Sequence, residues 1–334
     1  MNAPLPDPAT LTLVREEAIP VAVLTGFLGS GKTTLIRALL ADPAFAGTAV
    51  VVNEFGEIGL DHLMLERAAE DTVLLEGGCL CCASQGDLVR ALRSLLARRE
   101  RAELPAYRRV IVETSGLADP APILQTLMLD PLRLSRYRLA RLTAAVDGLL
   151  GIETLHRHSE AVRQVAFADE ILITKTDLID DDRLAATIAA IRATSAAPVT
   201  QSRARQHPGA RLFQSAGPGI GPETGETVHR HGDYTTLSRR FVASLPWPKV
   251  DAWLGRVVEC SSPRLLRLKA LLAIEGEDAP VLLQAVQHIV HRPERLASWP
   301  EAGRESRIVL IAEGIEKATL VQLIDDLLPA GVQP

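Results

Sequence analysis

Short apolar runs alternate with helix-like stretches through the first two hundred residues of the chain. The runs are residues 21–24, 49–52, 72–75, 110–112, 142–146, 171–173 and 198–199. Runs without polar alternation are typical of strands that are buried on both faces of a sheet. Between them, stretches such as 32–40 and 87–97 place their leucines on one helical face. The alternation predicts an α/β fold with a mostly parallel sheet flanked by helices, whose ligands bind at the carboxyl ends of the strands.

The pattern changes after Ser202. Residues 203–235 are rich in glycine, proline and charge, which predicts a linker or long loop. Beyond it the pattern predicts a small α+β domain, with strands at 238–245 and 307–312 and helices at 250–258 and 317–328. The first residues, 1–18, are proline-rich and predict a flexible arm. We therefore expect an α/β domain over 19–202, a linker over 203–235 and a C-terminal domain over 236–334.

Composition limits the classes of function. The 334 residues are 47% apolar but only 4% aromatic, so the core is expected to be aliphatic. A formal net charge of −5 argues against nucleic acid as the main partner. The N-terminus lacks the basic and apolar regions of a signal peptide, and no apolar run approaches the ~18 residues of a membrane span. We expect a cytoplasmic protein with no membrane partner.

A glycine-rich turn follows the first apolar run and ends in Gly31-Lys32-Thr33. It fits the pattern G-x-x-x-x-G-K-[ST] between a predicted strand and a predicted helix, the setting in which the pattern marks a phosphate-binding loop. Glycine lets backbone N–H groups approach phosphate oxygens, and the helix adds the positive end of its dipole. We expect Lys32 to bind the β- and γ-phosphates and Thr33 to bind Mg²⁺. The residues expected to hold the phosphates are Gly26, Gly29, Ser30, Gly31, Lys32, Thr33 and Thr34.

Two later loops supply further candidates for Mg²⁺ and the terminal phosphate. Glu113 ends the run 110–112, as the acidic residue of a Walker B strand does. We expect Glu113 to act at Mg²⁺ or its water shell, and Gly116 to offer its N–H to the γ-phosphate. The loop 53–61 contains hard oxygen ligands, including Asp61, that would reach Mg²⁺ directly or through water. A solvated acidic turn is the alternative for this loop.

Three of the four cysteines lie within four positions, in Gly-Gly-Cys79-Leu-Cys81-Cys82. Thiolates are soft ligands for Zn²⁺ and related transition metals. Three of them leave a coordination position open, which suits metal exchange better than a permanent structural site. Buried thiols without a ligand and redox chemistry are the alternatives.

The stretch Thr174-Lys175-Thr176-Asp177 follows a late apolar run and is similar to the guanine-reading Asn-Lys-x-Asp of GTPases. Asp177 would accept hydrogen bonds from guanine N1–H and the exocyclic amine, a donor pair that adenine lacks. Lys175 would lay its stem on the base. Thr174 replaces the usual asparagine, which weakens or alters the contact with the N7/O6 edge.

Together these stretches resemble the CobW-like family of P-loop GTPases. The resemblance is carried by TGFLGSGKTT, NEFGEIGLD, GGCLCC, ETSGLADP and TKTD, and it covers roughly residues 20–315. The Cys-x-Cys-Cys is its most specific part, because phosphate-binding loops alone are widespread. The later stretch LLRLKALLAIEG resembles the C-terminal domain of that family, with Ala270 where the family usually has glycine.

The resemblance implies a metal chaperone or insertase driven by GTP. Carried onto this sequence, Cys79, Cys81 and Cys82 would hold the cargo, with Zn²⁺ favoured over Co²⁺. GTP and Mg²⁺ would bind at the phosphate loop, with Lys32 and Glu113 serving hydrolysis. The expected partner is a client metalloprotein or a cobalt- or zinc-dependent pathway, and a nucleotide-dependent homodimer is compatible with the resemblance.

We expect GTP to favour the metal-holding state and hydrolysis to release the metal. Intrinsic turnover is expected to be slow, since no residue clearly positions the attacking water. Two other functions stay open from the sequence: a P-loop kinase acting on a small molecule, and a metal-binding regulatory module that holds nucleotide without hydrolysing it.

Overall fold

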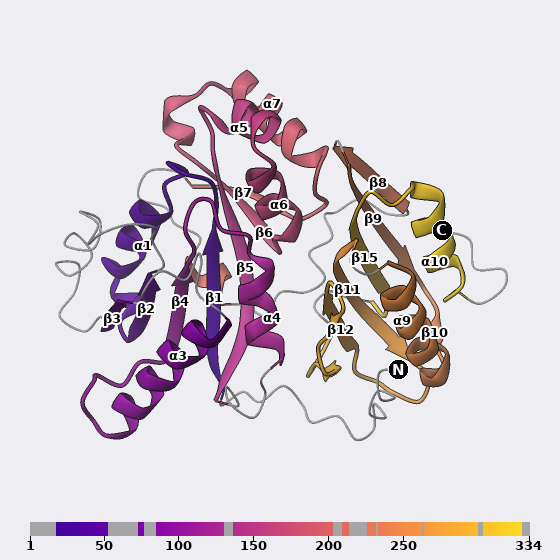
Figure 1. The fold of residues 1–334 in the computed structure, drawn as a ribbon, viewed down its shortest axis with the longest axis horizontal. Coiled ribbons are helices and arrows are strands. Elements are labelled where there is room, and N and C mark those ends of the chain that lie inside the picture. Colours follow the sequence, from indigo (N-terminus) through magenta and orange to yellow (C-terminus); the bar gives the residue numbers. More distant parts are fainter. Residues whose placement is uncertain are drawn as a thin grey trace. The chain divides into compact units, whose positions relative to one another are not determined.

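The computed structural model describes residues 18–52, 73–76, 85–129, 136–202, 209–213, 226–231, 233–261, 264–299 and 303–328. They form two compact units (Figure 1). One unit contains the described residues of 18–191 and 198–213, and the other contains 192–197 and the described residues from 226 onward. No helix within these ranges has the length and apolarity needed to cross a membrane.

The first unit is built on a seven-stranded sheet in the order β3-β2-β4-β1-β5-β6-β7. All of its strand pairs are parallel. The strands are β1 (Ile19–Thr25), β2 (Thr48–Val52), β3 (Val73–Glu76), β4 (Arg109–Glu113), β5 (Tyr137–Asp147), β6 (Glu170–Thr174) and β7 (Val199–Gln201). The fold class expected from the alternating pattern is therefore confirmed.

Helices connect these strands. They are α1 (Lys32–Leu40), α3 (Gln85–Glu100), α4 (Ala121–Leu129), α5 (Gly151–Arg157), α6 (Ser159–Phe167), α7 (Asp181–Arg192) and the short α8 (Gly209–Leu212), with 3₁₀ turns η2 (Pro43–Phe45) and η3 (Thr176–Leu178). Helix α1 buries Leu35, Ile36 and Leu39 in one cluster with Leu24 of β1 and Val50 of β2. Because its apolar residues recur at helical spacing, α1 lies on the sheet directly after the turn at the end of β1.

Strand β5 is longer than its apolar run. It begins at Tyr137, and pairing with β1 continues from there through Ala144. The polar Arg138 and Arg141 interrupt the apolar pattern at half-buried positions in this part of the strand. The run 142–146 therefore located only the fully buried end of β5.

The second unit is an eight-stranded sheet whose main order is β13-β12-β11-β15-β9-β8. Strand β10 pairs with β11 and β14 pairs with β12. Its elements are β8 (Glu226–His231), β9 (Tyr234–Phe241), β10 (Ser244–Leu245), α9 (Trp247–Ser261), β11 (Leu265–Ile274), β12 (Val281–Val286), β13 (Ile289–Val290), β14 (Glu294–Arg295), β15 (Ser306–Glu313) and α10 (Lys317–Asp325). This agrees with the expected C-terminal α+β architecture.

One face of this second sheet forms the core of the unit. Alternate residues of β11, such as Leu268 and Leu272, join Trp253 of α9 and Ile324 of α10 in a single buried cluster. The indole Nε1 of Trp253 also donates to the carbonyl of Leu323, at 2.6 Å. Alternate strand residues on one face of the sheet thus pack against helix residues that recur at helical spacing.

The range 203–235, expected to be a linker, contains secondary structure among its described residues. Helix α8 lies inside it, and β8 and the start of β9 form an antiparallel pair within it. Strand β8 is one end of the described sheet, where polar and charged residues are common. The composition of β8 therefore predicted a loop, although its backbone pairs with β9. The expected strand 238–245 is divided between β9 and β10.

Two buried tyrosines, just before β4 and at the start of β5, link these strands to helix α3 through hydrogen bonds. The hydroxyl of Tyr137 donates to the carbonyl of Leu92 in α3 at 2.9 Å, and the hydroxyl of Tyr107 lies 2.6 Å from that of Tyr137. Since the proton of Tyr137 is used on Leu92, Tyr107 is the donor between the two rings. Burial raises the pKa of both phenols, and for Tyr137 the hydrogen bond with Tyr107 raises it further.

This pair predicts how stability changes at alkaline pH. The folded unit keeps the Tyr107 proton while the unfolded chain releases it above pH ~10, so ionisation favours unfolding. Tyr107→Phe should cost about 1 kcal/mol at pH 8 through the lost hydrogen bond. Above pH ~10 that difference should shrink by up to about 1.4 kcal/mol per pH unit, because the wild type releases one more proton on unfolding there, that of Tyr107, than the variant does.

Urea unfolding of both proteins from pH 7 to pH 11 measures this difference. Between pH 7 and pH 9 it should be constant, which serves as the internal control. A difference in unfolding free energy that stays constant up to pH 11 would contradict the raised pKa of Tyr107.

Candidate nucleotide site

The turn after β1 is shaped by glycines. Gly26, Gly29 and Gly31 have φ values of 144°, 73° and 86°, a region that L side chains rarely adopt. A Cβ on Gly26 would lie 2.4 Å from the carbonyl oxygen of Ala145 in β5. Glycine is required there because the loop passes directly against the neighbouring strand.

Helix α1 begins with its first N–H groups available for an anion. Gly31 is the N-cap and provides no side-chain cap. The amino group of Lys32 is held inside the loop, where Nζ donates to the carbonyls of Gly26 at 2.7 Å and Phe27 at 3.3 Å. Backbone donors, the helix dipole and a fixed ammonium therefore converge on one spot, which is the arrangement that binds phosphate.

Thr33 and Glu113 meet across the sheet edge. The Thr33 hydroxyl donates to Oε1 of Glu113 at 2.8 Å, and Glu113 at the end of β4 is only 4% exposed. Because the hydroxyl donates its proton to the carboxylate, the lone pairs of its oxygen are directed elsewhere and are available to a cation. A hydroxyl beside a buried carboxylate is a hard oxygen donor set that fits Mg²⁺.

Gly116 touches the phosphate loop. A Cβ at Gly116 would lie 2.7 Å from the backbone nitrogen of Leu28 and 2.5 Å from its Cδ2 atom. Both residues line a polar cavity of about 340 Å³ together with Lys32, Thr33 and Glu113. The loop after β4 and the loop after β1 thus form two walls of one cavity.

The Thr174 side chain points to the phosphate loop. Its hydroxyl lies 2.7 Å from the carbonyl oxygen of Ser30 and 3.2 Å from that of Val146, and donates to both. The residue is 6% exposed. Threonine at this position therefore ties the loop after β6 to the loop after β1.

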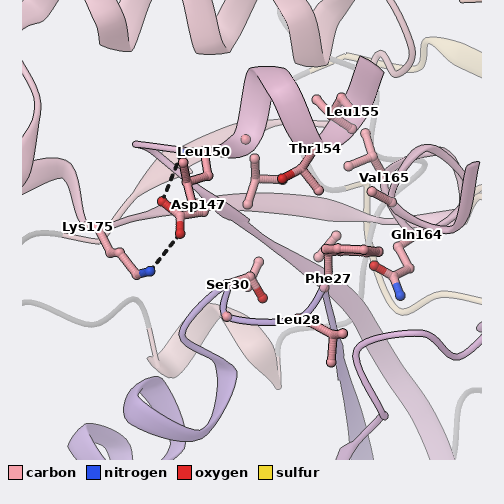
Figure 2. Close-up of a pocket in the computed structure, with 17 residues that line it drawn as sticks. Phe27, Leu28, Ser30, Asp147, Leu150, Thr154, Leu155, Gln164, Val165 and Lys175 are labelled. Atoms are coloured by element: carbon pink, nitrogen blue, oxygen red, sulfur yellow. Dashed lines mark hydrogen bonds and ion pairs between the residues drawn. The ribbon is translucent and has the colours of Figure 1, made fainter. Parts of the chain in front are cut away.

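Lys175 is held by a carboxylate at the end of β5. Its Nζ lies 2.6 Å from Oδ2 of Asp147, and Oδ1 of Asp147 accepts from the backbone nitrogens of Leu149 and Leu150 (Figure 2). The backbone of Lys175 is left-handed, with φ of 54°, and the carbonyl of Thr174 accepts from the Gly148 nitrogen. Asp147 thus positions the lysine that the sequence places on the nucleotide base.

A second, mainly apolar cavity of about 220 Å³ lies on the other side of the phosphate loop. Its walls come from residues 26–30, the end of β5, helix α5 and helix α6 (Figure 2). Lys175, Leu28 and Gly29 line both cavities. The phosphate loop is therefore the partition between a polar and an apolar space.

The structure brings most of the expected site residues to one sheet edge. The polar cavity is lined by Gly29, Gly31, Lys32, Thr33, Thr34, Glu113, Gly116 and Lys175. Gly26 and Ser30 line the apolar cavity. Thr174 lies beneath the phosphate loop, and Asp177 is exposed in η3 and lines neither cavity.

The expected cargo ligands Cys79, Cys81 and Cys82, and the expected Mg²⁺ ligand Asp61, lie outside the described residues. Within the described ranges, no group of three or more His, Cys, Asp or Glu side chains is arranged to hold a metal ion. The cysteine site therefore stays a prediction.

Three contributors were missed from the sequence. Arg37 lines the polar cavity one helical turn after Thr33, and its place on the face of α1 next to the phosphates could have been deduced from helical spacing. Asp147 ends a buried strand, which is the same signal that identified Glu113. Gln164 of α6 donates to the carbonyls of Gly116 and Ala118, and nothing local in the sequence indicates this.

Comparison with known protein families gives two matches. The family model described as CobW/HypB/UreG, nucleotide-binding domain, matches residues 20–200. The model described as cobalamin synthesis protein cobW C-terminal domain matches residues 234–328. Together they cover both units.

Individual relatives match over most of their length. The zinc chaperone YjiA of Escherichia coli is 34% identical over 81% of this chain and 87% of that protein. The zinc chaperone CobW of Pseudomonas aeruginosa is 29% identical over 90% of this chain and 89% of that protein. The crystal structure of Zn(II)-bound YjiA GTPase has a TM-score of 0.68 at 25% identity, covering 93% of this chain and 99% of that one.

The Asp147–Lys175 pair predicts a nucleotide-binding defect for Asp147→Asn. Asparagine keeps the Oδ1 acceptor for Leu149 and Leu150 but loses the ion pair, so Lys175 must be ordered when the base binds. Ordering one long side chain costs about 0.5–1.5 kcal/mol, which corresponds to a two- to tenfold loss of GDP affinity by calorimetry.

Glu153→Gln is the matched control, since it removes an exposed ion pair with Arg183 on neighbouring helices. It should leave GDP affinity unchanged. Wild-type GDP affinity in Asp147→Asn would show that Lys175 needs no such support.

Proposed function

We propose that this chain, which belongs to the CobW/HypB/UreG family and is a GTPase, is a zinc chaperone that couples GTP hydrolysis to delivery of the metal. The observation that carries the proposal is the Thr33–Glu113 pair beside Lys32, in a chain that matches two zinc chaperones over most of its length. The pair offers a cation site at the phosphates, and the relatives indicate what the hydrolysis is used for.

The residues of the polar cavity have distinct roles in hydrolysis. Lys32 and the N–H groups at the start of α1 hold the β- and γ-phosphates, and Gly116 offers its N–H to the γ-phosphate. Thr33 would ligate Mg²⁺, with Glu113 orienting that hydroxyl from behind. A cation held there would supply positive charge beside the phosphate oxygens, where negative charge develops during hydrolysis. Asp177 reads guanine, and Lys175 covers the base from its position on Asp147.

The cargo site is proposed at Cys79, Cys81 and Cys82. Strand β3 ends at Glu76, which is in register with Val52, and Val52 is in register with Glu113. Two strand spacings separate Glu76 from Glu113, about 10 Å. Cys79 follows Glu76 by three residues, so its Cα lies within about 11 Å of that of Glu76 by chain length alone. Chain length thus allows Cys79 to lie near the sheet edge that carries Glu113, which supports the proposed cargo site.

This nearness supports coupling between nucleotide and metal. The loops after β2, β3 and β4 leave adjacent strands, so a movement at the γ-phosphate reaches the cysteine turn without crossing the core. GTP favours the metal-holding state and hydrolysis favours release to a client metalloprotein. The same proposal places the protein in the cytoplasm, where thiols stay reduced. A nucleotide-dependent homodimer stays a prediction.

Zinc affinity should depend on the nucleotide. The complex with a non-hydrolysable GTP analogue should bind Zn²⁺ about 5- to 150-fold more tightly than the GDP complex, and Zn²⁺ should tighten binding of the analogue by the same factor. Competition with a chromophoric chelator measures the first quantity, and calorimetry with and without Zn²⁺ measures the second.

Replacing Cys79, Cys81 and Cys82 together by serine should abolish both effects, whereas Cys260→Ser in α9 should leave them intact. Equal zinc affinity in the two nucleotide states would refute the coupling. Tight, nucleotide-dependent zinc binding by the triple variant would instead place the cargo site elsewhere.

Gly116→Ala should impair hydrolysis more than binding. The new Cβ meets the Leu28 backbone, which cannot rotate away, so the loop must shift by a fraction of an ångström or more. Misplacement on this scale costs about a hundredfold in kcat. GDP, which lacks the γ-phosphate, should bind with near-wild-type affinity. A single-turnover GTP assay together with GDP calorimetry checks both parts, and unchanged kcat would show that Gly116 does not contact the transferred group.

A further inference from the structure

We propose that the apolar cavity behind the phosphate loop is a second binding site, for a small uncharged molecule that is mostly apolar and carries one hydrogen-bond donor. It is distinct from the polar cavity that holds the nucleotide. It does not depend on metal delivery, because none of its lining residues is an expected metal ligand.

The cavity has the dimensions of a ligand site. Its volume of about 220 Å³ exceeds the roughly 150 Å³ that admits benzene in an apolar protein interior. Ala144, Val165 and Leu155 are among the buried residues that form its walls. Leu28 and Leu150, which also line it, are 59% and 60% exposed. The cavity therefore has an apolar interior and an entrance with apolar side chains in contact with solvent.

The amide of Gln164 provides the polar feature of this site. Gln164 is 1% exposed, and its Nε2 donates to the carbonyls of Gly116 at 3.0 Å and Ala118 at 3.1 Å. Two carbonyl partners fix the orientation of the amide, because only its nitrogen can donate. The oxygen must then point the other way, and Figure 2 shows it on the side of Phe27, with the nitrogen turned away.

No group in the described part of the chain donates a hydrogen bond to the buried Oε1 of Gln164. A buried acceptor left without a donor costs free energy, so an incoming N–H or O–H group gains the interaction that this oxygen lacks. The Oγ of Ser30 is buried in the same lining and likewise has no partner among the described residues. Apolar walls with an unused acceptor select a neutral molecule that brings its own donor.

The position of Gln164 connects this site to the nucleotide. The amide that faces the cavity with its oxygen holds the Gly116 loop with its nitrogen, and that loop forms a wall of the polar cavity. A molecule bound at Oε1 therefore acts directly on the side chain that positions Gly116. A molecule in the apolar cavity should therefore change the position of Gly116 next to the γ-phosphate.

Indole and indene make a matched pair of probes, because they share size and shape and only indole has an N–H donor. Each is titrated into the full-length GDP complex while backbone and side-chain amide resonances are recorded. Indole should shift the Gln164 side-chain amide and the Gly116 amide saturably. It should bind about fivefold more tightly than indene, the factor for one net hydrogen bond.

Two variants separate the site from an unspecific effect. Ala161→Leu fills the cavity from α6 and should abolish binding of both probes while GDP affinity stays unchanged. Gln164→Met keeps the length of the side chain without its amide and should remove the preference for indole over indene. If either variant fails to fold, the comparison of the two probes on the wild type still decides.

Three results would overturn the proposal. They are the absence of saturable shifts up to the solubility limit of each probe, equal affinity for indole and indene in the wild type, and undiminished indole binding to a folded Ala161→Leu variant.

Discussion

The hydrogen bond from the Thr174 hydroxyl to the Ser30 carbonyl joins the two ends of the nucleotide site. It is buried, and it connects loops that lie far apart in the sequence and follow different strands, β6 and β1. The same hydroxyl also reaches Val146 at the end of β5, the strand between them. From the sequence, threonine in place of asparagine was interpreted as a weaker contact with the base. In the structure the threonine hydroxyl instead points to the phosphate loop and links it to the loop after β6.

Much of the site was predictable because parallel strands end at a common edge. Apolar runs located the seven strands, and a polar residue directly after each run pointed to that edge. Asp147 needed more than this signal, since its role depends on β5 lying next to β6 and on a turn that presents two backbone nitrogens to its carboxylate. Gln164 was invisible, because a helical glutamine that binds carbonyls of a distant loop leaves no periodic pattern. Strand β8 was missed because its composition resembles that of a loop.

The two cavities on either side of the phosphate loop have complementary character. The polar one gathers Lys32, Thr33 and Glu113, and suits a charged substrate. The apolar one presents Gln164 among aliphatic walls. Residues of both cavities act on Gly116. Leu28 leaves no space for a side chain there, and Gln164 donates a hydrogen bond to its carbonyl. At this position Leu28 thus excludes any side chain, and Gln164 fixes the backbone through a hydrogen bond.

The position of β3 at the end of the first sheet has a mechanical consequence. Among the described strands β3 pairs only with β2, while β1, which precedes the phosphate loop, is held by β4 and β5. A strand bonded on one side separates from its sheet at a lower free energy than one bonded on both. Strand β3 therefore lies at a margin of the sheet that is held on one side only. The phosphate loop follows β1, which is held on both sides, so β3 can yield while the phosphate loop keeps its geometry.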